Sequence, residues 1–221
     1  MFRLVILTLS MLLTGCATTL LAPKPISTSD LSETNGILIG SFARDPDGPT
    51  YYSQTIRYKN NETGKEHEIT AQLAFNMFNG KTPDDFKTKD SHGGVFAFSL
   101  PAGEYTFYNF RLYQSNGYFH QNWTSIEPFD IPFTVKPNRV NYVGEIKLSP
   151  FTGKNLFGMR VHAGGLWLVS NQSSRDFDIM MQKYPEIRLD KVNNIVPSEK
   201  KIFTPLVILP SEIEAYRKAI N

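Results

Sequence analysis

Cysteine is almost absent from this chain, whose 221 residues contain a single one, Cys16. One thiol allows no disulfide within a chain, so a folded body must be held by its own hydrophobic core, for which roughly 200 residues suffice. Neither charge sign predominates either, with 23 Lys and Arg against 21 Asp and Glu. This balance argues against a nucleic-acid partner, which requires a clustered basic face.

The chain also lacks an apolar run long enough to cross a bilayer, which takes about 20 residues. Its most apolar segment is short, from Leu4 to Leu13, with Arg3 before it and small residues after it. This is the size and flanking pattern of a secretory signal peptide. We therefore expect residues 1–15 to be a leader that is absent from the mature protein.

The leader ends in Leu13-Thr14-Gly15-Cys16, which resembles the lipobox of bacterial lipoproteins. The resemblance implies a diacylglycerol-cysteine at Cys16, cleavage just before it, and acylation (palmitate is typical) of the new amino group. Ala17 stands where inner-membrane retention usually shows Asp, which favours the outer membrane of the cell envelope. Several acyl chains anchor a protein firmly, whereas one does so only marginally. The alternative is an ordinary signal peptide that happens to contain a cysteine.

A polar segment with few large side chains follows, rich in Thr, Ser and Pro up to Asn35. It predicts that residues 16–35 are the lipidated cysteine and a flexible tether, whose nineteen residues after Cys16 span at most about 65 Å. No internal repeat or second linker interrupts the rest of the chain. Residues 36–221 are therefore expected to form one domain.

Beyond Gly36, apolar residues recur at alternate positions, the period of a strand with one buried face. Abundant aromatic residues, with Gly and Pro spread along the chain, favour many short strands and turns. The pattern predicts a mainly β fold, an antiparallel β-sandwich with one or two short C-terminal helices. The residues expected to face its core are Ile56, Leu73, Phe98, Phe107, Ile131, Phe133 and Ile146.

Local signals refine this expectation. Residues 60–65 predict a hairpin turn, and Leu100-Pro101-Ala102-Gly103 predicts a chain reversal between two strands. A change of phase in the alternation predicts a β-bulge near Phe107. A later strand is expected to place one set of alternating residues on one face, namely Tyr142, Gly144, Ile146 and Leu148.

Two helices are indicated near the C-terminus. Ser173 is the expected cap of the first, which ends before Pro185. Its apolar face is expected to comprise Phe177, Met180, Met181 and Tyr184, which would dock on the sheet or, as the alternative, form a partner groove. Ser211 with Glu214 forms a capping-box pattern that opens the second helix.

Residues 95–148 resemble the carboxypeptidase-regulatory-like or transthyretin-like β-sandwich modules found in uncharacterised lipoprotein families. The resemblance rests on the Pro-x-Gly turn followed by an aromatic strand, Leu100-Pro101-Ala102-Gly103-Glu104-Tyr105, and on the later run from Phe133 to Gly144. It implies a fold and no reaction, because such sandwiches host many unrelated functions. No catalytic residue is carried over from it.

Motifs for catalysis and metal binding are weak. His67-Glu68 begins like a zinc-protease motif, but Ala71 stands where the second histidine belongs. The other histidines lack ligand spacing, although a zinc site assembled through space stays open. The run Asp45-Pro46-Asp47-Gly48 lacks the further oxygen ligands of a calcium loop and is interpreted as a turn. No catalytic residue, metal or cofactor is predicted.

The turn at Asn116-Gly117 carries the densest group of amphipathic rings in the chain. Its candidate ligand- or partner-binding residues are Tyr118, Phe119, His120, Asn122 and Trp123. Aromatic faces beside amide groups can recognise a sugar, a peptide or a protein. The alternative is that these rings fold back over one end of the sandwich as a packing cluster.

These observations predict a lipid-anchored protein of the bacterial envelope that binds or supports an assembly, with another envelope protein or a glycan as partner. Two alternatives stay open: an envelope hydrolase whose site is assembled through space, and a surface-exposed adhesion or ligand-binding lipoprotein. A hydrolase would show a cleft with convergent polar groups, whereas a binding module would show an exposed aromatic patch.

Overall fold

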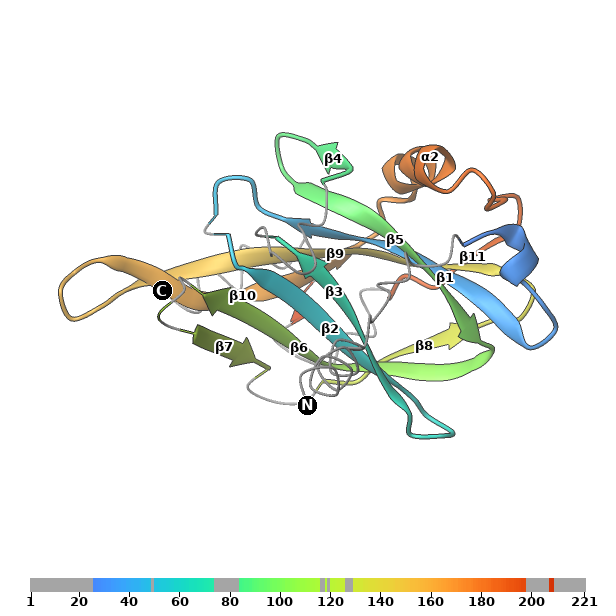
Figure 1. Cartoon of the computed structure of the whole chain (residues 1–221), viewed down its shortest axis with the longest axis horizontal. Helices are drawn as coiled ribbons and strands as arrows, with labels where there is room; N and C mark the ends of the chain where they lie inside the picture. Colours follow the sequence, from blue (N-terminus) through green and yellow to red (C-terminus); the bar gives the residue numbers. More distant parts are fainter. Residues whose placement is uncertain are drawn as a thin grey trace, which may run out of the picture.

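The computed structural model of the chain describes residues 26–48, 50–73, 84–115, 118, 120–125, 129–197 and 207–208. Two β-sheets pack face to face, and one short α-helix lies on the outer side of the larger sheet (Figure 1). This arrangement confirms the predicted mainly β sandwich. In the described part of the chain, no helix has both the length and the apolar character needed to span a bilayer.

The larger sheet has the strand order β12-β10-β9-β1-β5-β4, with β11 pairing to β9. Its strands are β1 (Asn35–Arg44), β4 (Phe86–Lys87), β5 (His92–Pro101), β9 (Val140–Lys154), β10 (Arg160–Ser170), β11 (Val192–Asn194) and β12 (Val207–Ile208). β1 is antiparallel to β5 but parallel to β9. The sheet is therefore mixed, a property that side-chain alternation cannot predict because it is the same for both directions.

The smaller sheet has the order β3-β2-β6-β7, and β8 pairs with the first half of β6. Its strands are β2 (Ser53–Asn60), β3 (Glu66–Gln72), β6 (Gly103–Ser115), β7 (His120–Thr124) and β8 (Ile131–Val135). All of its pairings are antiparallel. The β2–β3 hairpin confirms the predicted turn, in which the Asn60 side chain accepts hydrogen bonds from the backbone N–H groups of Glu62 and Thr63 at 3.0 and 2.8 Å.

Two further local predictions are confirmed. The chain reverses at Pro101–Gly103, where it leaves β5 of the larger sheet and enters β6 of the smaller one. Arg57 pairs with Asn109 whereas Tyr58 pairs with Phe107, which leaves Tyr108 as the extra residue of a β-bulge. The bulge bends β6 next to Phe107, as the change of phase in the sequence indicated.

The main core fills the space between the two sheets. Six of the seven residues predicted to face a core are buried, namely Ile56, Leu73, Phe107, Ile131, Phe133 and Ile146. The prediction for Phe98 is wrong, since 37% of it is exposed. Among the described strands, β4 pairs with β5 only at His92 and Gly93, so the edge of β5 at Phe98 has no described neighbour. The Phe98 ring packs against Phe96.

A second core lies on the other face of the larger sheet, beneath α2 (Ser173–Lys183). Met180 is buried there against Ile37, Ile39 and Tyr142, which confirms the docked helix. Met181 is 52% exposed, which corrects its predicted place on the docking face. Its neighbour Met180 points into the core, and adjacent residues of a helix diverge by about 100°.

The N-terminus of α2 differs from the prediction by one residue. Ser173 is the first residue of α2 and not its cap: Gln172 occupies that position without a side-chain hydrogen bond. The Asn171 side chain instead accepts a hydrogen bond from the Ser173 backbone N–H at 3.0 Å. The second helix, predicted from Ser211 onwards, lies outside the described residues.

The C-terminal part of the predicted tether, residues 16–35, packs on the body. η1 (Thr28–Asp30) docks on the body, where the backbone N–H of Thr28 donates to the carbonyl of Glu186 at 2.9 Å. Ile26 and Leu31 pack against the second core, and β1 begins at Asn35. Only residues 17–25 then separate Cys16 from the packed chain, a contour length of at most about 32 Å.

Candidate functional site

The β6–β7 hairpin carries the residues predicted to bind a partner. Its strands pair from Arg111 opposite Thr124 to Ser115 opposite His120. Tyr118 is 91% exposed at the turn, and His120 and Asn122 are exposed on β7. Asn116, Gly117 and Phe119 lie outside the described residues. The structure thus places three of the five candidates at the surface of one edge hairpin.

Strand alternation divides this group, because successive side chains point to opposite faces. Trp123 lies opposite Leu112 and packs against the main core. Its ring meets Tyr51 edge-on, with 5.2 Å between centroids. For Trp123 the packing alternative is therefore correct, and its large ring is a half-buried anchor of the hairpin.

The outward face of the hairpin has ordered polar rings. The Tyr113 hydroxyl and Nδ1 of His120 are 2.7 Å apart, and the two rings are stacked with centroids at 6.0 Å. Tyr52 meets Tyr113 edge-on at 5.5 Å. Asn122 lies opposite Tyr113 in the register. Among the described strands β7 pairs only with β6, so its outer edge offers backbone donors and acceptors next to these rings.

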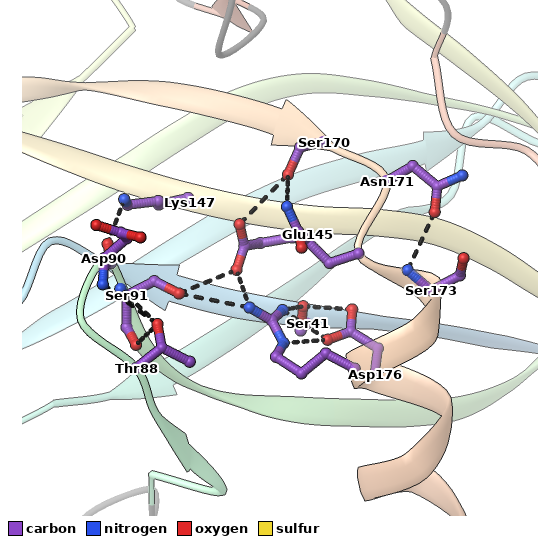
Figure 2. Close-up of polar contacts among 12 residues, drawn as sticks. Ser41, Thr88, Asp90, Ser91, Glu145, Lys147, Ser170, Asn171, Ser173 and Asp176 are labelled. Atoms are coloured by element: carbon purple, nitrogen blue, oxygen red, sulfur yellow. Dashed lines mark hydrogen bonds and ion pairs between the residues drawn. The ribbon is translucent and has the colours of Figure 1, made fainter.

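Sequence reasoning missed a second polar cluster, which lies between α2 and the outer face of the larger sheet. Figure 2 shows Glu145, Ser41, Ser91 and Asp176 converging from β9, β1, the segment before β5 and α2. Arg175 of α2 is at its centre. Its Nη1 lies 2.9 Å from Oε2 of Glu145, and its Nη2 lies 2.6 Å from Oδ1 of Asp176.

A β-bulge explains why these groups meet. Ile39 pairs with Tyr142 and Ser41 with Glu145, so β9 contains one residue more than β1 between these pairs. Gly144 lies in the bulge with φ +95°, and a Cβ there would be 2.7 Å from the carbonyl oxygen of Ser170. Tyr142 and Glu145 consequently both face α2. The predicted single face from Tyr142 to Leu148 is wrong, because Ile146 and Leu148 face the main core.

The second carboxylate of the cluster, that of Asp176, is almost fully buried. Its Oδ2 accepts hydrogen bonds from the hydroxyls of Ser41 at 2.7 Å and Tyr142 at 2.8 Å. It also lies in the first turn of α2, where the helix dipole favours negative charge. Burial, with the negative charge of Asp176 as a further cause, raises the pKa of Tyr142. The tyrosine therefore stays protonated as a donor to Asp176.

The remaining groups of the cluster are also paired. Burial alone would lower the pKa of Arg175, but Asp176 and Glu145 outweigh it and raise that pKa. The guanidinium also lies 3.8 Å from the ring centroid of Phe86. The Ser170 hydroxyl donates to Glu145 at 3.3 Å. A groove of about 360 Å³ borders the cluster, lined by Ser91, Glu145, Ser170, Gln172 and Arg175 among others.

This pairing decides what the cluster can do chemically. Both carboxylates already face a cation or hydroxyl donors, so neither is poised to take a proton from a substrate. The cluster instead fixes α2 on the sheet through opposite charges on two elements. One sequence signal could have found it: Glu145 interrupts the otherwise apolar run from Tyr142 to Ile146.

The residues considered as metal ligands from the sequence contact other protein side chains. Asp45 accepts a hydrogen bond from Ser149 at 2.6 Å and pairs with Lys147 at 2.8 Å, as a turn residue can. His67 stacks on Tyr58, with 5.3 Å between ring centroids. Over the part of the chain that the structure describes, no three His, Cys, Asp or Glu side chains gather as a metal site would require.

No family model matches the chain, and no curated protein does. Among solved structures, it is similar to the crystal structure of a leucine-rich repeat protein from Bacteroides thetaiotaomicron VPI-5482, with a TM-score of 0.32 and 11% sequence identity. That match covers 86% of this chain and 29% of that chain. The chain thus spans less than a third of that protein, and a likeness of this size carries no argument. The resemblances to a lipobox and to transthyretin-like modules stay predictions.

Proposed function

We propose that this chain is a lipid-anchored protein of the bacterial cell envelope that binds a partner protein through the β6–β7 hairpin. The observation that carries the proposal is the exposed outer edge of β7 beside the ordered rings of Tyr113 and His120. A partner segment can add to such an edge through main-chain hydrogen bonds. The exposed side chains beside it would then supply specificity.

The arrangement of the hairpin supports binding. Trp123 fixes β7 to the core, and the Tyr113–His120 contact orders the outward face before any partner arrives. A surface that is already ordered loses less conformational freedom on association. Anchoring would come from Cys16, whose sequence context resembles a lipobox. The paired state of Arg175, Glu145 and Asp176 favours binding over a hydrolase, because that cluster already has its partners.

The partner is tested by photo-crosslinking in intact cells, with the photoreactive amino acid at Tyr118. The control position is Glu62, an exposed residue in the β2–β3 turn. A discrete adduct at position 118 that is absent from position 62 is expected, and His120→Ala with Asn122→Ala should remove it. An adduct with a glycan would replace the partner protein by a sugar, and equal adducts at both positions would contradict the proposal.

The anchor is tested separately. Cys16→Ser should abolish lipidation and leave either an unprocessed or a soluble chain, because the thiol is the acylated group. Mass spectrometry of the N-terminal peptide from the membrane fraction measures this directly. An unmodified Cys16 in the membrane-bound protein would contradict the lipoprotein part of the proposal and leave the crosslinking result intact.

A further inference from the structure

The β9–β10 hairpin projects from one end of the sandwich, well beyond the neighbouring strands (Figure 1). Its tip is a stiff turn at Asn155–Met159. The side-chain oxygen of Asn155 accepts hydrogen bonds from the backbone N–H groups of Phe157 and Met159, both at 3.0 Å. Gly158 has φ +74° and open space around it. The turn is therefore closed by hydrogen bonds among its own residues.

This ordered turn presents apolar side chains to solvent. The exposed fraction is 102% for Leu156, 84% for Phe157 and 58% for Met159. Single exposed apolar residues are common, but three together at a projecting tip form a patch of the kind that marks an interaction site. The patch is convex, so whatever binds it must be able to surround the projecting side chains.

Two basic residues lie directly behind the tip. Lys154 and Arg160 are paired across the two strands, and both are exposed. Like charges opposite each other in a sheet are destabilising. Neither side chain forms a hydrogen bond or ion pair within the described residues. Asp47 lines the same groove as Arg160, and no Asp or Glu occurs between Glu145 and Asp176 in the sequence.

We infer that the β9–β10 tip is a membrane-contact site that inserts Leu156 and Phe157 into the headgroup region of an anionic bilayer. Apolar and aromatic side chains partition into that region. The stems of Lys154 and Arg160 can extend along it while their charged ends reach lipid phosphates. Lys154 and Arg160, which have no partner among the described residues, thereby gain anionic partners, and this is the reason to prefer a bilayer over a protein pocket. The inference goes beyond the proposed function and does not require lipidation at Cys16.

The inference commits to the bilayer to which the protein itself is attached. η1, which the tether would precede, lies at the opposite end of the long axis (Figure 1). With the sandwich lengthwise on this membrane, the tip and the end that carries η1 both reach it. A second, opposing bilayer is the alternative that the experiment tests.

The experiment uses the full-length protein purified from membranes and reconstituted into vesicles of phosphatidylcholine with phosphatidylglycerol. Phe157→Trp provides a fluorescent reporter, and brominated phospholipids quench it on contact. Met181→Trp is the matched control, since Met181 is also an exposed apolar residue but lies on α2. The native chain gives the background from Trp123 and Trp167. Brominated lipid is placed either in the vesicles that carry the protein or in a second, protein-free population.

Strong quenching of position 157 and little at 181 is expected when the brominated lipid is in the vesicles that carry the protein. Quenching only by the protein-free population would overturn the inference and indicate an opposing bilayer. Lys154→Gln and Arg160→Gln should each weaken the insertion about fivefold on anionic vesicles, and high salt should do the same. Vesicles of phosphatidylcholine alone should show much less quenching of the Phe157→Trp chain.

Equal quenching of positions 157 and 181, or none in either arm, would overturn the inference. Insertion unaffected by the two Gln variants would overturn the role of the basic pair. All variants lie at exposed positions, so an unchanged melting temperature confirms that they fold. Failure of lipidation would appear as loss of the native chain from floated vesicles, independently of where the tip reporter lies.

Discussion

Glu145 of β9 and Arg175 of α2 are joined by an ion pair of 2.9 Å between Oε2 and Nη1. Glu145 is 4% exposed, and the side chain of Arg175 is 21% exposed. A buried ion pair contributes little net stability compared with apolar residues of the same shape, but breaking it leaves an uncompensated charge. The pair therefore fixes the position of α2 more than it adds to stability.

Arg175→Ala should therefore be severely destabilising. It leaves both Glu145 and Asp176 without their cation, at a cost of about 3 kcal/mol, the lower end of the usual range because Arg175 is partly solvated. The melting temperature should fall by about 6 to 12 °C at this chain length. Arg188→Ala, at an exposed arginine after α2, is the control for loss of a positive charge. Equal melting temperatures for the two variants would contradict the prediction.

Alkaline pH should destabilise the fold through buried tyrosines. Burial, with Tyr105 as a further cause, raises the pKa of Tyr58 to about 12, against an ordinary value of 10.0. Between these values the unfolded chain has lost this proton and the folded chain keeps it, so the free energy of unfolding falls as pH rises. Below pH 10 this contribution is fully present. Urea unfolding from pH 8 upwards measures the slope.

Tyr58→Phe should make that alkaline decline shallower while changing the stability little at neutral pH. Tyr51, whose pKa burial also raises to about 12, should account for part of the remaining decline. The control is Tyr118→Phe, because that ring is 91% exposed at the hairpin turn. If the free energy of unfolding falls as steeply with pH in Tyr58→Phe as in the native chain, Tyr58 does not cause the alkaline loss of stability.

Phe133 should be essential to the sandwich. Its ring stacks on Phe107 with 4.4 Å between centroids and on Tyr105 at 5.4 Å, and only 5% of it is exposed. Phe133→Ala should cost about 3 to 5 kcal/mol, because it removes apolar burial and leaves a cavity. Phe157→Ala makes the same chemical change at an exposed position and should leave the melting temperature unchanged. Circular dichroism during heating compares the two.

The two faces of β7 should separate stability from binding. Trp123→Ala should destabilise the fold by about 2 to 3 kcal/mol, less than full burial would give, because the ring is half-buried. His120→Ala with Asn122→Ala should leave the melting temperature within a few degrees and reduce crosslinking at position 118. The reverse outcome, with stability lost in the outward pair and binding lost only in Trp123→Ala, would contradict the assigned faces.

Several local features could be predicted because each depends on neighbours in sequence. The turn at Pro101–Gly103 follows from the fixed φ of proline, and the bulge at Tyr108 follows from a change of phase within one strand. The buried positions of β8 follow from simple alternation, since its pattern is regular from Ile131 to Val135. The Asn116-Gly117 turn signal and the aromatic residues around it predicted the candidate hairpin. They did not predict that Trp123 faces the core, which follows from the alternation of side chains along β7.

By itself the sequence determined the fold class and most of the core of the sandwich, and it predicts a leader and an anchor at Cys16. Only the tertiary structure decided that β1 lies parallel to β9 and that Tyr142 and Glu145 face the same side. The second fact depends on the bulge at Gly144, which arises in the pairing of β9 with β1, about a hundred residues away in the chain. Pairing of distant segments is not encoded in the local alternation of side chains, and that pairing created the charge cluster under α2.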